Sequence, residues 1–200
     1  PRPSANPGGE PLVTANDEAL ARLAGIADAW LLHDRDIVIR CDDSVLRALP
    51  AAQFVRRARG YTPRAIRLPR AGPAVVATGG HFKNTVCVTR GDEAFVSEHV
   101  GDLDNAATCA ALEDSVAHLG AILDVEPAAV AHDLHPDFFS TRLAVRLAAQ
   151  WRVPALAVQH HHAHVAAVVA ERRLDGPVLG LALDGVGFGS DGAAWGGELL

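Results

Sequence analysis

The strongest constraint on the fold is a regular alternation of strand-like and helix-like segments after residue 73. Residues 74–78 form a short apolar run typical of a buried strand, and two further strand-like runs, 84–89 and 94–100, flank a turn at Gly91 and Asp92. The chain then alternates between helical and extended patterns. Helices are predicted at 105–123, 140–151 and 160–171, and strands at 129–132, 155–158 and 178–183.

The order of these segments predicts the architecture. Three strands followed by helix, strand, helix and strand is the order of a ribonuclease-H-like half domain, the unit that is duplicated in actin-like ATPases. We therefore expect an α/β fold with α+β elements. Such folds place glycine loops at strand ends, where backbone N–H groups can approach phosphates. Two glycine groups fit those positions: Gly79 with Gly80, and Gly185 with Gly187 and Gly189.

A histidine cluster precedes the second glycine loop. His160 and His164 are four residues apart in a helical run, so they share one face and can bind one metal ion. His161 is rotated by about 100° from His160 on a helix of 3.6 residues per turn. We therefore expect His161 and His162 to contact substrate or phosphate. The alternative is that all four histidines make ordinary hydrogen bonds at the start of a helix.

Composition bounds the class of protein. The 200 residues are 49% hydrophobic, enough for a substantial core, and the sequence contains neither a long apolar span nor a signal-peptide pattern. We expect a soluble cytoplasmic protein with no membrane partner. The three cysteines are widely spaced and include no CxxC pair, which favours reduced thiols over disulfides or a zinc ribbon. The absence of methionine indicates an internal fragment of a longer protein.

Charge is unevenly distributed along the chain. The net charge is -6, yet six arginines fall between Arg56 and Arg70, while residues 91–141 contain eleven acidic residues and no Lys or Arg. The arginine patch is short and has few aromatic neighbours, which disfavours nucleic acid as a partner. It could instead form a solvated strand edge or salt bridges with the acidic half.

A domain boundary is expected near residues 69–73, where proline and glycine suggest a linker. This divides the chain into residues 1–69 and 73–200. Within the first part the pattern predicts a helix at 14–30 and a short strand at 37–39.

The motifs together resemble one family. The matching segments, in order along the chain, are 3–6, 33–36, 40–45, 54–61, 79–85, 132–136, the histidine run and the Asp184 loop. They resemble the HypF family of hydrogenase-maturation carbamoyltransferases over essentially the whole chain. The resemblance implies that residues 1–69 are the C-terminal part of a YrdC-like nucleotide-binding domain. Residues 73–200 would be the N-terminal lobe of a carbamoyl transferase domain similar to the tRNA threonylcarbamoyl transferase.

The resemblance implies nucleotide-binding residues in the first part. Ser4 and Asn6 match one contact segment of YrdC-like domains, and Asp43 with Ser44 matches a second. A basic closure over the phosphates is assigned to Arg56, Arg57 and Arg59. Guanidinium groups suit this role because they stabilise developing phosphoryl charge through bidentate hydrogen bonds.

The resemblance also implies the transferase residues. His160 and His164 match the family's two histidine ligands of an iron or zinc ion, whose further aspartate ligand is expected beyond residue 200. Asp184 matches an aspartate that contacts nucleotide or carbamoyl adenylate, and Lys83 and Asn84 are expected to face it from the first glycine loop.

The activity implied is ATP-dependent carbamoyl transfer. Carbamoyl phosphate and ATP would form carbamoyl adenylate, and the carbamoyl group would pass to the C-terminal cysteine of a HypE-like partner protein. Two alternatives remain open. One is an O-carbamoyltransferase of small-molecule biosynthesis, disfavoured because the YrdC-like part precedes the transferase part. The other is a non-catalytic module for metal binding and partner docking.

The 200-residue segment by itself is expected to be inactive, because it would hold parts of two active sites. We predict that it releases no pyrophosphate when ATP and carbamoyl phosphate are supplied, as measured by a coupled pyrophosphate assay. Robust turnover by the isolated segment would contradict the prediction.

Overall fold

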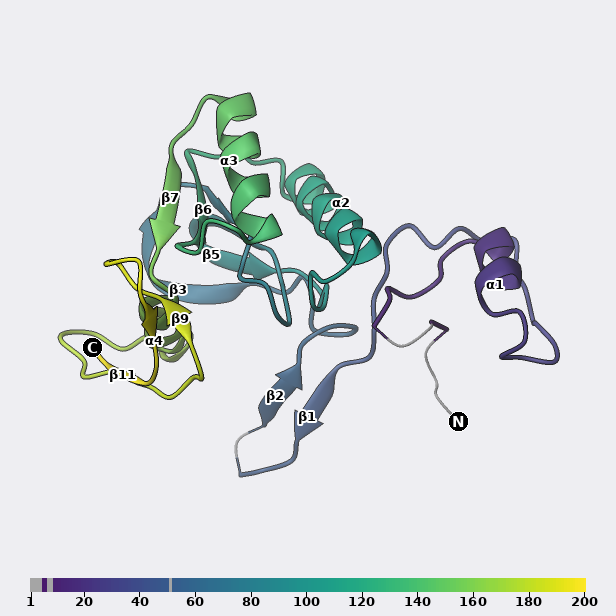
Figure 1. Ribbon diagram of the computed structural model, residues 1–200, viewed down its shortest axis with the longest axis horizontal. Helices are drawn as coiled ribbons and strands as arrows, with labels where there is room; N and C mark the ends of the chain where they lie inside the picture. The colour runs from purple at the N-terminus through teal and green to yellow at the C-terminus, as the bar shows by residue number, and fades with distance from the viewer. Residues whose placement is uncertain (1–4, 7–8, 51) are drawn as a thin grey trace.

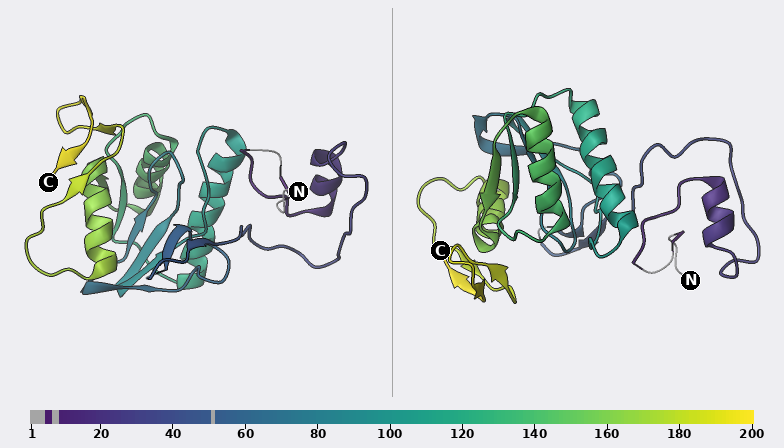
Figure 2. Two further views of the ribbon diagram at one scale, coloured as in Figure 1. Left: turned by 90° about the horizontal axis from the view of Figure 1, so that it is seen from below. Right: turned by 45° about the horizontal axis from the view of Figure 1, so that its top comes forward.

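A mixed five-stranded sheet forms the body of the protein in the computed structural model, which describes residues 5–6, 9–50 and 52–200. In spatial order the strands are β3 (Ile66–Gly72), β5 (Cys87–Val96), β4 (Val75–Ala77), β6 (Ala129–Asp133) and β7 (Ala155–Val158). Helices α2 (Ala106–Leu123) and α3 (Phe139–Trp151) lie side by side over one face (Figures 1 and 2). Helix α4 (His160–Arg172) contacts β3 and the C-terminal strands. The α/β architecture expected from the sequence is confirmed.

The sheet has a parallel half and an antiparallel half. β4 pairs in parallel with β6, and β6 pairs in parallel with β7. β4 pairs antiparallel with β5 on its other side. This is the arrangement that the predicted order of strands and helices requires, since each parallel neighbour is reached through a helix.

β5 contains both arms of the expected hairpin. Ser97 donates its backbone N–H to the carbonyl of Val86 at 2.8 Å, so the two ends of the segment lie against each other. A straight strand of this length would separate them by about 30 Å. The reversal occurs at Gly91, whose φ of 60° lies in the left-handed region. The turn predicted at Gly91 and Asp92 is therefore present.

The segment read as a linker is instead a strand. β3 covers residues 66–72 and pairs antiparallel with β5, with Ile66 opposite Ala94 and Gly72 opposite Gly91. Pro69 is tolerated because β3 is at the edge of the sheet, where a missing N–H breaks no ladder on the open side. The division of the chain into two domains stays a prediction, but the proposed linker belongs to the sheet.

The N-terminal part differs most from the sequence prediction. Helix α1 spans only Asn16–Arg22 and ends at the C-cap Leu23, and the chain then turns at Gly25, which has a φ of 77°. The strand expected at 37–39 is not formed, and Val38 is largely exposed. Strands β1 (Val45–Arg47) and β2 (Gln53–Arg56) form an antiparallel hairpin instead. In Figure 1, α1 lies well away from the sheet and the hairpin projects below it.

The C-terminal segment forms two small antiparallel pairs. β8 (Leu181–Ala182) pairs with β11 (Glu198–Leu199), and β9 (Gly187–Phe188) pairs with β10 (Ala194–Trp195). The strand predicted at 178–183 is thus shorter than expected. The second glycine loop leads into strands, as its sequence indicates.

The hydrophobic core lies between the sheet and the helices α2 and α3. Its buried members come from strands β4 and β5 and their flanks, from α2 and from α3: Val76, Val86, Val88, Phe95, Leu103, Leu112, Val116, Leu119, Leu123 and Leu143. Asn105 begins α2 as its N-cap, accepting a hydrogen bond from the N–H of Thr108 at 2.9 Å. Within the described residues, no helix has the length and apolarity needed to span a bilayer.

We predict that Leu112→Ala lowers the free energy of unfolding by about 2–5 kcal/mol, because Leu112 is fully buried and the substitution leaves a cavity. Ile122→Ala on the same helix is the matched control, since Ile122 is 53% exposed; its effect should stay within about 0.5 kcal/mol. Urea unfolding followed by circular dichroism measures both. Equal destabilisation by the two substitutions would contradict this description of the core.

Candidate metal centre

The carboxyl edge of the parallel strands collects the polar residues of the site. Gly79 and Gly80 follow β4, Asp133 ends β6, and α4 begins at His160 directly after β7. Gln159 caps α4: its Oε1 accepts from the N–H of His162 at 2.9 Å. Because these strands are parallel, their carboxyl ends meet at one edge, and so do the residues that follow them.

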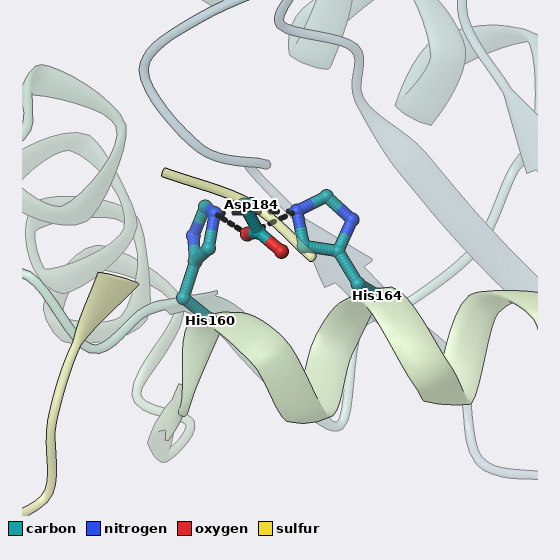
Figure 3. A group of neighbouring side chains, drawn as sticks. All are labelled: His160, His164 and Asp184. Carbon is teal, nitrogen blue, oxygen red and sulfur yellow. Dashed lines mark hydrogen bonds and ion pairs between the residues drawn. The ribbon is translucent and has the colours of Figure 1, made fainter. Parts of the chain in front are cut away.

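Three side chains form a compact triangle at this edge. The Nε2 atoms of His160 and His164 lie 3.2 Å apart, one helical turn from each other. Asp184 Oδ2 lies 3.1 Å from His160 Nε2 and 3.2 Å from His164 Nε2. Figure 3 shows both imidazoles projecting from α4 toward the Asp184 carboxylate. The sequence predicted the histidine pair; it placed Asp184 beside a nucleotide and not between the histidines.

The triangle fits a single metal ion. A tetrahedral zinc site with ligand bonds of about 2.0–2.1 Å has ligand atoms about 3.3 Å apart. The three observed separations are close to that value and nearly equal. Asp184 Oδ2 is buried, and no hydrogen bond of normal geometry reaches it within the described part of the chain. A buried carboxylate oxygen without a donor indicates a place for a cation.

Asp133 contacts the same centre from behind. It is 9% exposed, and its Oδ2 lies 2.7 Å from His160 Nδ1, on the side of the ring opposite Asp184. Asp133 lies in the segment 132–136 that carries the family resemblance, and its position at the end of a buried strand is the sequence signal for a role at this site.

His161 and His162 occupy different environments. The His161 side chain is fully buried; its Nδ1 lies 3.0 Å from Gln159 Nε2, and its Nε2 lies 3.7 Å from Asp184 Oδ2. His162 is exposed, and its backbone N–H is bound by Gln159. The structure therefore brings His161 near the triangle as a packed neighbour and turns His162 toward solvent.

The second glycine loop packs directly on α4. A Cβ added at Gly187 would lie 2.5 Å from His161 Cε1 and 2.9 Å from His160 Cβ, so only glycine fits there. Gly189 is similarly crowded by the Trp195 indole. Gly185 is exposed and faces open space. The close approach at Gly187 lets Asp184, three residues earlier, reach the two histidines.

The first glycine loop is held by Asn84. Gly79 has a φ of 71°, and Asn84 Nδ2 donates to the carbonyls of Thr78 and Gly80 at 2.8 Å each. Asn84 is only 2% exposed, so it braces the loop from inside the protein. A Cβ added at Gly80 would lie 3.8 Å from Asp133 Oδ2, which places this loop beside the metal triangle.

Lys83 lies apart from the triangle. It is exposed, with a φ of 48°, and its backbone N–H donates to Asp102 Oδ1 at 2.7 Å. Its side chain lines a cavity of about 750 Å³ between the N-terminal segment and the sheet domain. Arg40, Arg56 and His99 line the same cavity.

A column of aromatic rings borders the centre. His81 stacks on Phe138 with ring centroids 5.2 Å apart, and Phe138 stacks on His135 at 4.2 Å with nearly parallel planes. His135 then contacts the Phe188 ring at 5.1 Å. The column joins the first glycine loop, the segment after β6 and the second glycine loop.

The predicted nucleotide residues are spread over the N-terminal part. Ser4 lies outside the described residues. Asn6 lines the 750 Å³ cavity and donates to the Glu10 carbonyl. Ser44 accepts from the Ala58 N–H at 2.8 Å and donates to the Arg59 carbonyl at 3.0 Å, so it fastens the strand pair.

The arginines point in different directions. Arg56 pairs with Asp42 at the cavity wall. Arg57 donates to the Arg64 carbonyl at 2.7 Å, and burial lowers the pKa of its guanidinium group, as does nearby Arg64.

Arg59 and Asp43 are both exposed. The Arg59 guanidinium lies 3.8 Å from the Asp43 carboxylate, and it donates to the Cys41 carbonyl at 2.8 Å. Of the three arginines predicted to close over phosphates, Arg56 is the one that lines the cavity.

The family model and similar curated proteins point to the same family. The family model described as the HypF Kae1-like domain matches residues 70–171. Carbamoyltransferase HypF2 of Cupriavidus necator is 72% identical over 98% of this chain and 25% of its own length. Carbamoyltransferase HypF of Rhizobium leguminosarum bv. viciae is 58% identical over 98% of this chain and 26% of its own length. The chain thus spans about a quarter of the length of these relatives.

Solved structures agree with the sequence relatives. A full-length HypF in a phosphate- and nucleotide-bound form matches with a TM-score of 0.91 and 44% identity, over 98% of this chain and 31% of that one. HypF of T. kodakarensis matches with a TM-score of 0.92 and 39% identity, over 98% of this chain and 26% of that one. The chain therefore belongs to the HypF carbamoyltransferase family.

Proposed function

We propose that this segment is part of an ATP-dependent carbamoyltransferase of nickel-iron hydrogenase maturation. The whole protein would form carbamoyl adenylate from carbamoyl phosphate and ATP. It would then transfer the carbamoyl group to the C-terminal cysteine of a HypE-like acceptor. Membership of the HypF family supports the reaction class, and the triangle of His160, His164 and Asp184 is the observation that carries the proposal.

His160, His164 and Asp184 would hold one divalent ion, iron or zinc. When bound, the ion supplies Lewis-acid stabilisation of charge that develops on the carbamoyl or phosphate oxygens. The chain itself supplies orientation. Asp184 reaches the histidines because Gly187 packs against α4, and the two imidazoles share one face of a capped helix.

The glycine loops are suited to hold the substrate beside this centre. Gly80 and Gly185 present backbone without a side chain, and Gly80 lies next to Asp133 at the carboxyl edge of the sheet. Backbone N–H groups of such loops bind phosphate oxygens without steric hindrance. This location favours a phosphate-bearing substrate such as carbamoyl adenylate.

The cavity of about 750 Å³ supports a role for the N-terminal part in nucleotide binding. It lies where the N-terminal segment meets the sheet domain, and basic side chains from both line it, including Arg40, Arg56 and Lys83. Acidic residues line it as well, among them Glu10, Asp42 and Asp102, and Asp42 pairs with Arg56, so the charge of the cavity wall is mixed. Asn6 lines the same cavity, in keeping with its predicted part in nucleotide binding.

We predict that His160→Ala, His164→Ala and Asp184→Ala each lower the iron or zinc content of the full-length protein by about one equivalent, because each removes one of the proposed ligands. Elemental analysis by mass spectrometry after gel filtration measures the content.

His162→Ala is the matched control, since His162 belongs to the same run but faces solvent. It should keep the wild-type metal content. The same content in all five proteins would contradict the proposed ligand set.

We predict that the full-length protein, given ATP and carbamoyl phosphate labelled with ¹⁴C, carbamoylates a peptide that ends in cysteine. His160→Ala should slow this labelling on the order of 100-fold or more, because Lewis-acid stabilisation is worth several kcal/mol. Scintillation counting of the purified peptide gives the rate.

A peptide that ends in serine is the matched acceptor control and should remain unlabelled. Labelling of a small hydroxyl acceptor in place of the cysteine peptide would favour the O-carbamoyltransferase. A protein that binds metal but labels neither acceptor would favour the non-catalytic docking module.

A further inference from the structure

Asp133 joins two elements through its two carboxylate oxygens. Oδ2 lies 2.7 Å from His160 Nδ1, and Oδ1 accepts the backbone N–H of His135 at 2.8 Å. The side chain of Asp133 is only 6% exposed. A buried carboxylate that is satisfied by two separate partners holds both in place, because either partner can move only by leaving a charged oxygen unpaired.

The contact to His160 decides which nitrogen of that ring carries hydrogen. An ionised carboxylate only accepts hydrogen bonds, so Asp133, which makes the shorter of the two carboxylate contacts to this ring, favours the neutral imidazole with its hydrogen on Nδ1. The lone pair of Nε2 then points toward Asp184 and His164. In the opposite tautomer an N–H at Nε2 would lie 3.1 Å from Asp184 Oδ2 and would block metal binding.

We infer that Asp133 is a positioning residue that selects the metal-binding tautomer of His160 and fixes the direction of its ring. This inference rests on the proposed metal centre. Its chemistry is that of a carboxylate, histidine and metal arranged in a row, in which the outer carboxylate orients the ligand and raises its basicity.

The second oxygen extends this effect to the substrate side. His135, whose N–H is bound by Asp133, stacks on Phe138 and contacts Phe188 of the second glycine loop. The single carboxylate of Asp133 therefore holds both His160 and His135, and His135 is part of the column of aromatic rings. Loss of this carboxylate should therefore loosen both the His160 ring and the column of aromatic rings.

The test is the affinity of the full-length protein for Zn²⁺, measured by competition with a chromophoric chelator. The double variant His160→Ala/His164→Ala provides the baseline for zinc bound elsewhere. Asp133→Ala should weaken binding at the centre about 10–100-fold. Asp133→Asn should have a smaller effect, because the amide keeps one acceptor oxygen. That oxygen can accept from only one of the two present partners, the His135 backbone N–H or the His160 ring.

Asp137→Asn is the matched control. It removes one negative charge from the same segment, but the contacts of Asp137 use its backbone N–H and carbonyl, which asparagine retains. It should bind Zn²⁺ as the wild type does. Equal weakening by Asp137→Asn would mean that net charge, and not the contact to His160, sets the affinity, and would overturn the inference.

A second readout separates positioning from a general structural role. In the metal-free protein at pH about 8, where imidazoles are neutral, ¹⁵N chemical shifts should show His160 with hydrogen on Nδ1. Asp133→Asn should shift the population toward hydrogen on Nε2, while a merely loosened fold would leave the tautomer ratio unchanged. Unchanged affinity and tautomer in both Asp133 variants would refute the inference. A wild type that binds no Zn²⁺ above the baseline would refute the metal centre itself.

Discussion

Parallel pairing of β4, β6 and β7 is the constraint on which the rest of the structure depends. Each pair must be joined by a crossover, which places α2 and α3 over the same face of the sheet. The main core forms between that face and the two helices. The same pairing brings three carboxyl ends to one edge. A glycine turn, a buried carboxylate and a helix N-terminus with two histidines therefore meet, although more than 80 residues separate the first from the last.

The electrostatics of this edge are unusual for an interior. Two carboxylates, Asp133 and Asp184, approach opposite sides of the His160 ring, and the His164 ring contacts Asp184 as well. Burying two negative charges is costly unless positive charge balances them. A divalent cation at the proposed site among His160, His164 and Asp184 would provide that balance.

Local pattern predicted most of the sheet domain from sequence. The apolar runs at 74–78, 129–132 and 155–158 and the helical periods between them correspond to observed elements. The i, i+4 spacing also predicted that His160 and His164 would meet. The remaining features depend on tertiary contacts that no local pattern contains. Asp133, for example, is the last residue of β6. It reaches His160 only because β6 and β7 pair in parallel, which places the start of α4 beside it.

The errors of the sequence prediction have physical causes as well. The role of Asn84 in binding a ligand, which the family resemblance implies, stays a prediction; in the structure its amide donates to the carbonyls of Thr78 and Gly80 and holds that turn together. The chain turns at Gly25, just after α1, through a positive φ that a periodicity of apolar residues does not reveal. Pro69 resembled a linker residue, yet an edge strand accepts it.

The course of β3 has a consequence for how this protein can be divided. The match to the Kae1-like domain begins at residue 70, in the middle of β3. A chain that started there would lose Ile66 and Arg67, which pair with Ala94 and Glu93 in the second arm of the β5 hairpin. That arm would become an open strand with unpaired backbone groups, which invites association with other chains. The physical unit therefore includes Ile66 and Arg67, so the edge of the sheet is completed by residues that lie outside the matched region.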